Sequence, residues 1–363
     1  MPHNRPCQDI RALQPPEQAV MNPDQAVYSD PTRTQTTIAS EPDPRFSVAP
    51  MLDWTTSDCR VLHRLISTHA LLYTEMVTTG ALLHGDAARH LAYHASEHPV
   101  ALQLGGSHPE ELARCARMAQ AWGYDEVNLN VGCPSDRVQN NMIGACLMAH
   151  PQRVAECLAE MQAAVRIPVT IKHRLGIDEL DSFEHLHRFV EIVRQSGCTR
   201  FIIHARKALL QGLSPKENRT IPPLDYDRVY RIKALYPELT ISINGGIKTH
   251  AECARHLQRV DGVMVGREVY QNPWPLLSEA DRRYFGDDHP RRSRMEVAEA
   301  FIPYLEQRLA QGAPLYAVTK HLLGLFHGQR GGKQFRRYLS ENGHTRTAGV
   351  KTFQAALALV RGD

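Results

Sequence analysis

A cysteine directly after an apolar run is the residue of this sequence best placed to do chemistry. Cys133 stands near the end of the segment NLNVGCP (128–134), in which apolar and polar residues alternate before Gly-Cys-Pro, as they do where a strand passes into a loop. A thiol with an ordinary pKa of about 8.5 is mostly protonated at neutral pH, so Cys133 could act as a general acid toward a developing carbanion. A nucleophilic Cys/His hydrolase is the rival interpretation, but no base or oxyanion partner is identifiable. Many cysteines are only small buried apolar residues, as we expect for Cys157 and Cys253.

Three other polar residues follow apolar runs and could hold a ring that accepts electrons. Lys172 could stabilise the negative charge that such a ring gains on reduction, and Gln103 and His204 could hydrogen-bond its polar edge. For Lys172 alone, a salt bridge to a neighbouring carboxylate explains the position equally well.

Glycines follow the last two apolar runs. Asn244, Gly245 and Gly246 stand in SINGGIKTH, and Gly266 and Arg267 stand in VMVGREVY. Glycines let backbone N–H groups approach an anion, and Arg267 could add a charge-assisted hydrogen bond. A phosphate there, with a ring held from the other runs, describes a site for flavin mononucleotide (FMN).

Eight short runs rich in Val, Ile and Leu position these residues, and they recur roughly every 30 residues, the length of one strand-helix unit. Helical patterns lie between them, with Ser57, Pro109 and Pro151 at three expected helix starts. This repetition predicts an α/β fold, a (β/α)8 TIM barrel, whose open mouth lies at the carboxyl ends of the strands. An open doubly wound sheet is the alternative, but neither GxGxxG after the first run nor GxxxxGK[ST] is present. The runs are 45–51, 71–76, 100–106, 126–132, 169–176, 201–206, 240–246 and 262–267, and Met51 and Glu75 end the first two.

The chain divides into three parts. Residues 1–44 have few large apolar residues and are expected to form a disordered N-terminal extension, whereas 45–287 hold the FMN-binding catalytic barrel. Residues 291–363 carry 12 Lys and Arg against 5 Asp and Glu, although the net charge of the whole chain is only +3, so a polyanion is a plausible partner of this segment. We expect a C-terminal helical bundle there, with helices at 294–311, 314–326, 331–342 and 347–360.

Composition excludes several classes. The eight cysteines include no CxxC pair and no ligand cluster, so we expect reduced thiols and no structural metal. No apolar run is long enough to cross a bilayer and the N-terminus has no apolar signal core, so we expect a cytoplasmic protein with no membrane contact.

The sequence resembles the tRNA-dihydrouridine synthases, most closely their A-type subfamily, from about Arg45 to its end. The block IIHARKALLQGLSPKENRTIPPLDYDRV (202–229) is the most specific, because it sets the A-type apart. The other blocks are APM (49–51), LNVGCP (129–134), IKHRLG (171–176), SINGGI (242–247) and MVGREVYQNPW (264–274).

The resemblance implies a flavin-dependent reductase that saturates the 5,6 double bond of uridines 20 and 20a in the tRNA D-loop. NADPH would reduce FMN, the flavin would pass a hydride to C6 of uracil, and Cys133 would protonate C5. The implied FMN contacts are Ala49, Pro50, Met51, Gln103, Lys172, His204, Asn244, Gly245, Gly246, Gly266 and Arg267. The implied substrate contacts are Asn130, Arg206, Lys207, Glu217 and Arg219, with Asn130 and Arg219 facing the uracil and its tRNA.

A base within folded RNA must be turned out before a flavin reaches it, which requires RNA contacts beyond the pocket. Arg330, Lys333 and Arg337 have the spacing of one helix face, with Arg336 beside them, and are expected to bind the tRNA elbow. An ordinary solvated basic face is the alternative.

Two other functions stay open. One is an FMN barrel that reduces a small pyrimidine or enone, with the tail used for dimerisation. The other is a catalytically silent RNA-binding protein, which the presence of both Cys133 and Lys172 disfavours. We expect no stable protein partner.

Overall fold

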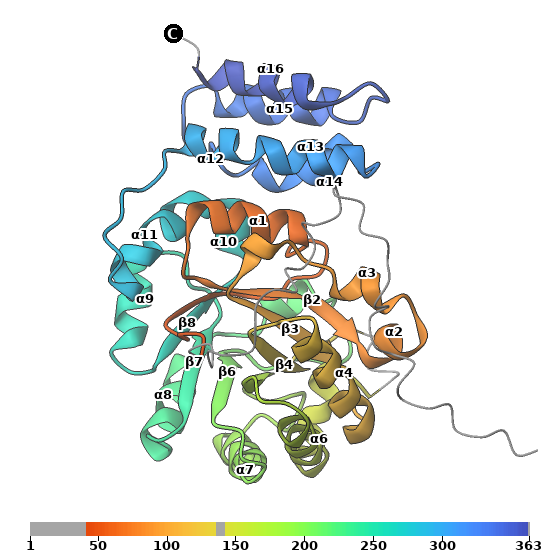
Figure 1. Cartoon of the computed structure of the whole chain (residues 1–363). Coiled ribbons are helices and arrows are strands. Elements are labelled where there is room, and N and C mark those ends of the chain that lie inside the picture. The colour runs from red at the N-terminus through yellow and green to blue at the C-terminus, as the bar shows by residue number, and fades with distance from the viewer. Residues whose placement is uncertain (1–40, 136–141, 362–363) are drawn as a thin grey trace, which may run out of the picture.

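Eight parallel strands close into a barrel in the computed structural model, which describes residues 41–135 and 142–361 (Figure 1). Each strand pairs with the next along the chain, and β8 pairs with β1. The (β/α)8 barrel is therefore confirmed, and the open sheet is excluded. The strands are β1 (Phe46–Val48), β2 (Leu71–Thr78), β3 (Val100–Gly105), β4 (Glu126–Val131), β5 (Val169–Arg174), β6 (Arg200–His204), β7 (Thr240–Asn244) and β8 (Gly262–Val265).

Helices cover the outside of the barrel (Figure 1). Three of them begin at the expected residues, Ser57, Pro109 and Pro151; Pro is well tolerated in the first turn of a helix, and Ser57 directly follows the N-cap residue Thr56. These helices are α1 (Ser57–Ile66), α2 (Thr79–His84), α3 (Ala87–Leu91), α4 (Pro109–Ala121), α6 (Pro151–Ala164), α7 (Phe183–Arg194), α8 (Tyr226–Leu235), α9 (His250–Leu257), α10 (Arg267–Gln271) and α11 (Pro273–Phe285). Short 3₁₀ helices lie at η3 (Ala95–Glu97), η4 (Gly144–Ala149) and η5 (Glu217–Arg219).

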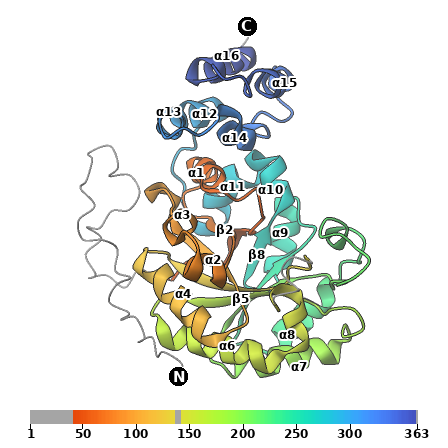
Figure 2. The same cartoon turned by 90° about the vertical axis from the view of Figure 1, so that its right-hand side faces the viewer.

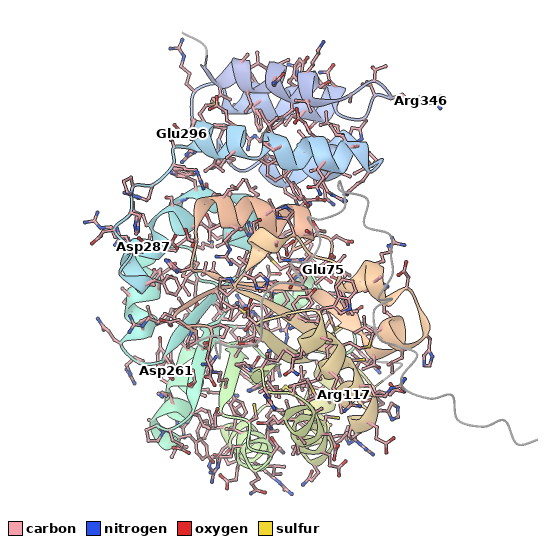
Figure 3. The ribbon with its side chains drawn as sticks, viewed as in Figure 1. Glu75, Arg117, Asp261, Asp287, Glu296 and Arg346 are labelled. Atoms are coloured by element: carbon pink, nitrogen blue, oxygen red, sulfur yellow. The ribbon has the colours of Figure 1, made fainter. Side chains whose placement is uncertain are left out.

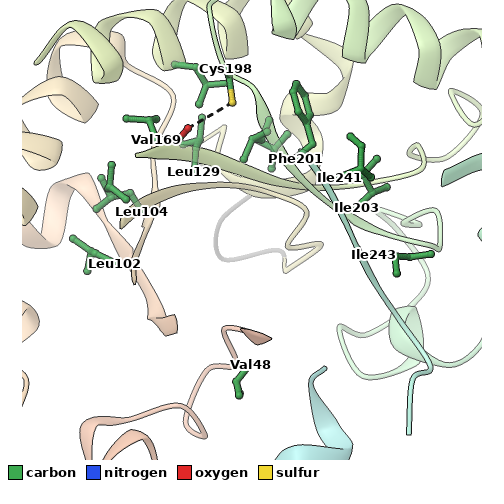
Figure 4. Close-up of a cluster of buried hydrophobic side chains, with 14 of the residues drawn as sticks. Val48, Leu102, Leu104, Leu129, Val169, Cys198, Phe201, Ile203, Ile241 and Ile243 are labelled. Carbon is green, nitrogen blue, oxygen red and sulfur yellow. Dashed lines mark hydrogen bonds between the residues drawn. The ribbon is translucent and has the colours of Figure 1, made fainter. Parts of the chain in front are cut away.

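The strands are buried on both faces, because alternate side chains point to the helices and to the barrel interior. Figure 4 shows part of the large cluster between strands and helices, including Leu104, Leu129 and Ile203. Cys198 belongs to the same cluster, and its Sγ donates to the Val169 carbonyl oxygen at 3.7 Å (Figure 4). A second, smaller cluster comprises Ala49, Leu71, Tyr73, Ala101, Ile202 and Met264.

Glu75 does not end its strand, contrary to expectation. β2 continues to Thr78, with an irregular register against β3 between Tyr73 and Met76. The Glu75 carboxylate instead accepts a hydrogen bond from the Asp53 backbone N–H at 2.6 Å, so it supports the loop after β1.

The C-terminal helices form a layer beside α1 and α11, at one side of the barrel (Figures 1 and 2). The first expected helix is divided near Phe301, because Pro303 cannot donate the hydrogen bond that would continue it. The second is also shorter than expected, since only five residues are α-helical before a 3₁₀ turn. The elements are α12 (Arg294–Ala300), α13 (Ile302–Ala310), α14 (Leu315–Thr319), η6 (Lys320–Leu322), α15 (Gly332–Asn342) and α16 (Val350–Arg361).

Helix α1 joins this layer to the barrel. Val61 and Leu62 of α1 belong to the hydrophobic core of the C-terminal helices. The α1 residue Asp58 accepts hydrogen bonds from Tyr304 Oη at 2.7 Å and Arg308 Nε at 2.8 Å, both on α13. A buried core together with these polar contacts holds the C-terminal helices against the barrel.

The last four residues assigned to the N-terminal extension, 41–44, contact the barrel. Arg200 at the start of β6 donates to Glu41 Oε2 at 2.6 Å and to the Pro42 carbonyl oxygen at 3.1 Å. The rest of the predicted disordered extension lies outside the described residues.

The seven cysteines in the described ranges are free thiols. Over the same ranges, no three His, Cys, Asp or Glu side chains are grouped so that they could hold a metal ion. No helix traced in the structure has the length and apolar character needed to cross a membrane.

Candidate active site

The loop that carries Cys133 is fixed on both sides. The Asn130 side-chain oxygen accepts hydrogen bonds from the backbone N–H groups of Gly132 and Cys133, both at 3.0 Å. The Cys133 carbonyl oxygen accepts from the Ala145 N–H at 2.8 Å, next to Gly144, whose φ is +83°. The half-buried thiol therefore stands on a rigid turn at the barrel mouth.

Lys172 lies on the neighbouring strand, where it pairs in register with Asn130. Burial, assisted by the Arg174 guanidinium and opposed by Cys133, lowers the pKa of Lys172 to about 7. An anionic partner would restore the charge of Lys172, because an opposite charge favours the protonated amine.

Arg174 is a site residue to which the sequence alone led us to assign no role. Its Nε donates to the Gly132 carbonyl oxygen at 2.9 Å, and its Nη1 donates to the carbonyl oxygens of Lys207 at 3.0 Å and Asn218 at 2.9 Å. Arg174 thus ties the loops after β4 and β6 together. The available signal was its position two residues after Lys172, which places both side chains on the same face of β5.

His204 carries an unsatisfied polar atom. Its Nδ1 is buried and has no hydrogen-bond partner. Burial holds the pKa of His204 well below its ordinary range, and the charges of Arg174 and Lys172 add to this effect, so the ring is neutral. A buried imidazole nitrogen without a partner is what a polar ligand would satisfy.

The ends of β1, β7 and β8 meet around small residues. Gly245 and Gly246 have φ values of +120° and +74°, a conformation that favours glycine. A Cβ on Gly266 would lie 3.5 Å from both Ala49 Cβ and Met51 Sδ, so these residues adjoin one another. Pro50, half-buried, lies between Ala49 and Met51, and the Asn244 side chain donates to the Met264 carbonyl oxygen at 2.7 Å.

Positive charge gathers around the same mouth. Burial lowers the pKa of Arg206 and of Arg219, and the nearby Arg267 lowers both further. Arg267 is exposed and donates through Nη2 to the Arg219 carbonyl oxygen at 3.2 Å. Arg206, Arg219 and Arg267 thus bring positive charge to the glycine-containing mouth, which suits a phosphate.

Some expected substrate contacts also have local partners. Lys207 forms a 2.8 Å ion pair with Asp181. The Glu217 carboxylate accepts hydrogen bonds from the backbone and hydroxyl groups of Ser214. Arg206 donates to the Pro222 carbonyl oxygen. These residues brace the loop after β6, where Arg219 lies exposed.

The expected basic face of the tail is only partly helical. Helix α15 begins at Gly332, so Arg330 precedes it in a turn. Lys333 and Arg337 are exposed one turn apart on α15, and Arg336 is half-buried. The four basic residues of the tail therefore lie on α15 or just before it.

Large apolar side chains are exposed on the loops of the mouth, a feature that sequence patterns did not reveal. Leu52 follows β1 and is 67 % exposed, and Ile221 in the loop after β6 is 58 % exposed. Met142 and Leu180, in the loops after β4 and β5, are 42 % and 39 % exposed. These four side chains lie on the loops that follow β1, β4, β5 and β6, at the rim of the mouth.

Comparisons with known proteins agree on one family. The model of the dihydrouridine synthase family matches residues 47–360. A tRNA-dihydrouridine(20/20a) synthase of Yersinia pestis is 57 % identical over 328 residues, which cover 90 % of this chain and 94 % of that protein. The proteins of the same name from Pasteurella multocida and Escherichia coli O6:H1 are 59 % and 58 % identical, each over 87 % of this chain and over 96 % and 95 % of their own lengths. A solved structure, the old yellow enzyme homologue from Zymomonas mobilis, is 12 % identical with a TM-score of 0.47, covering 70 % of this chain and 91 % of its own, which is too distant to indicate function.

Proposed function

This chain belongs to the dihydrouridine synthase family, and from that premise we propose that it reduces uridines 20 and 20a of the tRNA D-loop with NADPH through bound FMN. The observation that carries the proposal is the arrangement of the mouth, where the Cys133 loop adjoins a strand bearing Lys172 and Arg174. We place this activity in the cytoplasm, where tRNA is modified.

The residues present fit FMN. Gly245, Gly246 and Gly266, with Arg267 beside them, would hold its phosphate, because no Cβ blocks the backbone N–H groups. The unsatisfied Nδ1 of His204 would find a partner in the flavin ring. Ala49, Pro50, Met51, Gln103, Lys172 and Asn244 are the other proposed contacts.

When bound, FMN would supply a hydride for C6 of the uracil ring. The Cys133 thiol would give its proton to C5 from the opposite side, as the general acid. Asn130 would keep the thiol in place, since its side-chain oxygen holds the backbone of the Cys133 loop. Lys172 would be charged beside an anionic ligand and would stabilise negative charge on the ring.

We further propose that tRNA lies across both the mouth and the C-terminal helices. The two are contiguous, because Lys320 of η6 donates to the Asp53 carbonyl oxygen at 3.4 Å, and Thr56 Oγ1 lies 3.0 Å from His321 Nε2. Exposed Leu52, next to Asp53, would contact bases from the rim. Arg206, Lys207, Glu217, Arg219, Arg330, Lys333, Arg336 and Arg337 are the other proposed tRNA contacts.

The test uses purified protein with NADPH and unmodified tRNA. The wild type should be yellow and should form dihydrouridine, and Cys133→Ala should keep FMN but lose at least about a hundredfold in rate, the usual value of a general acid. Cys146→Ala is the matched control, since Cys146 is also half-buried but lies on η4, and its rate should be unchanged.

A colourless preparation that binds no added FMN would contradict the flavin assignment. A wild-type rate in Cys133→Ala would contradict the acid role. Reduction of free uridine as fast as tRNA would favour the small-molecule reductase.

A further inference from the structure

A line of buried polar side chains runs along the inside of the barrel, from the Cys133 loop toward the opposite end of the strands. Glu126, Asn128 and Asn130 are alternate residues of β4 and are 2 %, 0 % and 9 % exposed. Gln103 pairs with Asn128 in register from β3, and Thr170 pairs with it from β5. Polar side chains at such depth persist only where each has a hydrogen-bond partner.

At the mouth, the line begins with two backbone donors. The N–H groups of Gly132 and Cys133 donate to Asn130 Oδ1. Asn130 Nδ2 then donates to Gln103 Oε1 at 2.8 Å. Gln103 Nε2 in turn donates to Asn128 Oδ1 at 2.8 Å. Each amide therefore accepts on the side of the mouth and donates toward the base.

At the base, the line ends on a carboxylate. Asn128 Nδ2 donates to Thr170 Oγ1 at 2.8 Å, and Thr170 Oγ1 donates to Glu126 Oε1 at 2.7 Å. Tyr73 Oη donates to the same Glu126 oxygen at 2.5 Å but is bound to no other member of the line. Arg200 Nη1 lies 4.0 Å from Glu126 Oε2. Burial raises the pKa of Glu126, and Tyr73, Thr170 and Arg200 oppose that rise.

The direction of the line is set at both ends. A backbone N–H can only donate, and Glu126 Oε1 accepts from the hydroxyls of both Thr170 and Tyr73, whereas an amide can present either its oxygen or its nitrogen. Turning over any of the three amides would place two donors or two acceptors against each other. Such a mismatch inside a protein is costly, because neither group can turn to water.

We propose that Glu126, at the closed end of the barrel, is a positioning residue for the active site, which acts through Thr170, Asn128 and Gln103 on Asn130 and the Cys133 loop. This rests on the proposed function, in which Gln103 contacts FMN and Cys133 is the acid. The hydrogen bonds among the described residues leave Gln103 Nε2 one further N–H. Gln103 would thus keep a donor for a ligand, and Glu126, acting through Thr170 and Asn128, fixes that orientation together with the backbone donors at the mouth.

Four single substitutions separate this role from ordinary stabilisation. Thr170→Val interrupts the line while keeping the size of the side chain, and Thr170→Ser restores the hydroxyl. Tyr73→Phe removes a hydrogen bond to the same carboxylate oxygen without interrupting the line. Glu126→Gln places an amide, which can donate, where the line ends on a carboxylate, and so disrupts the line at the base of the barrel.

The readouts are the visible spectrum and Kd of FMN, and the rate at which iodoacetamide alkylates Cys133 in FMN-free protein, resolved by peptide mass spectrometry. Thr170→Val and Glu126→Gln should each raise the Kd of FMN and change the alkylation rate of Cys133 by about fivefold or more, which corresponds to the loss of one hydrogen bond. Thr170→Ser and Tyr73→Phe should stay within about twofold of wild type by the same measure.

Wild-type values in folded Thr170→Val would overturn the proposal, as would equal effects of Tyr73→Phe and Thr170→Val. If Thr170→Val and Glu126→Gln do not fold, the other two variants decide. A change in the Kd of FMN or in the alkylation rate of Tyr73→Phe would then overturn the proposal, and so would values for Thr170→Ser that differ from wild type. A wild type that binds no FMN would contradict the proposed function instead, and the alkylation rates would still decide the role of Glu126.

Discussion

Replacing Gly144 by alanine tests whether the position of Cys133 is imposed by its loop. Gly144 has a φ of +83°, and a Cβ there would overlap the Cys133 carbonyl oxygen. Left-handed alanine costs about 1–2 kcal/mol by itself. Displacing the Cys133 carbonyl also breaks its hydrogen bond from Ala145, which adds about 1 kcal/mol. We expect Gly144→Ala to lower the free energy of unfolding by about 2–3 kcal/mol.

Gly286→Ala is the matched control. Gly286 ends α11 with a φ of +69°, and a Cβ there would meet nothing within 4 Å. The free energy of unfolding of Gly286→Ala, measured in urea, should fall only by the conformational cost of about 1–2 kcal/mol. Its rate of dihydrouridine formation should be unchanged. Gly144→Ala should lose at least about tenfold in rate, because the thiol moves away from the uracil. Equal stability losses, or a wild-type rate in Gly144→Ala, would refute the reasoning.

Two further predictions concern charge. Replacing Lys333 and Arg337 by Gln should weaken tRNA binding and make its dependence on the logarithm of salt concentration shallower by about 1.5, measured by filter binding. The same replacements at Arg114 and Arg117 should change neither, because both lie on α4 (Figure 1), which is away from the C-terminal helices, as Arg117 shows in Figure 3; equal effects of the two pairs would argue against a specific tail contact. Because burial lowers the pKa of Lys172 to about 7, the unfolded chain binds a proton that the folded chain lacks above that pH. In FMN-free protein the stability that Lys172 contributes should therefore rise with pH from about 7 toward 10, and urea unfolding of FMN-free Lys172→Met relative to FMN-free wild type should show that pH-dependent difference; parallel pH profiles would contradict it.

The barrel was predictable from the sequence because its repeat is local. Each apolar run and the helix after it lie within a few tens of residues, and helix starts such as Pro109 and Pro151 carry their own signals. The break near Phe301 was also visible, since Pro303 stands inside the pattern that we interpreted as one helix. The end of β2 was not predictable from the sequence, because pairing with β3 extends that strand beyond Glu75.

The candidate site was only partly predictable, because spacing does not tell which polar groups meet. The alternation in β4 predicted a strand that ends before Cys133, but not that the strand is buried on both faces with Asn128 and Asn130 inside the barrel. Their partners come from β3 and β5, which are distant in sequence. Arg174 was similarly hidden, since its partners are backbone carbonyl groups that leave no mark in the side-chain pattern.

The most direct test of the central claim is the mapping of dihydrouridine in tRNA from cells that carry or lack this gene, by mass spectrometry of D-loop fragments. We predict that positions 20 and 20a contain uridine in cells without the gene. The wild-type gene should restore dihydrouridine at both positions, and the Cys133→Ala gene should not. Dihydrouridine that persists at both positions without the gene, or that Cys133→Ala restores fully, would contradict the account.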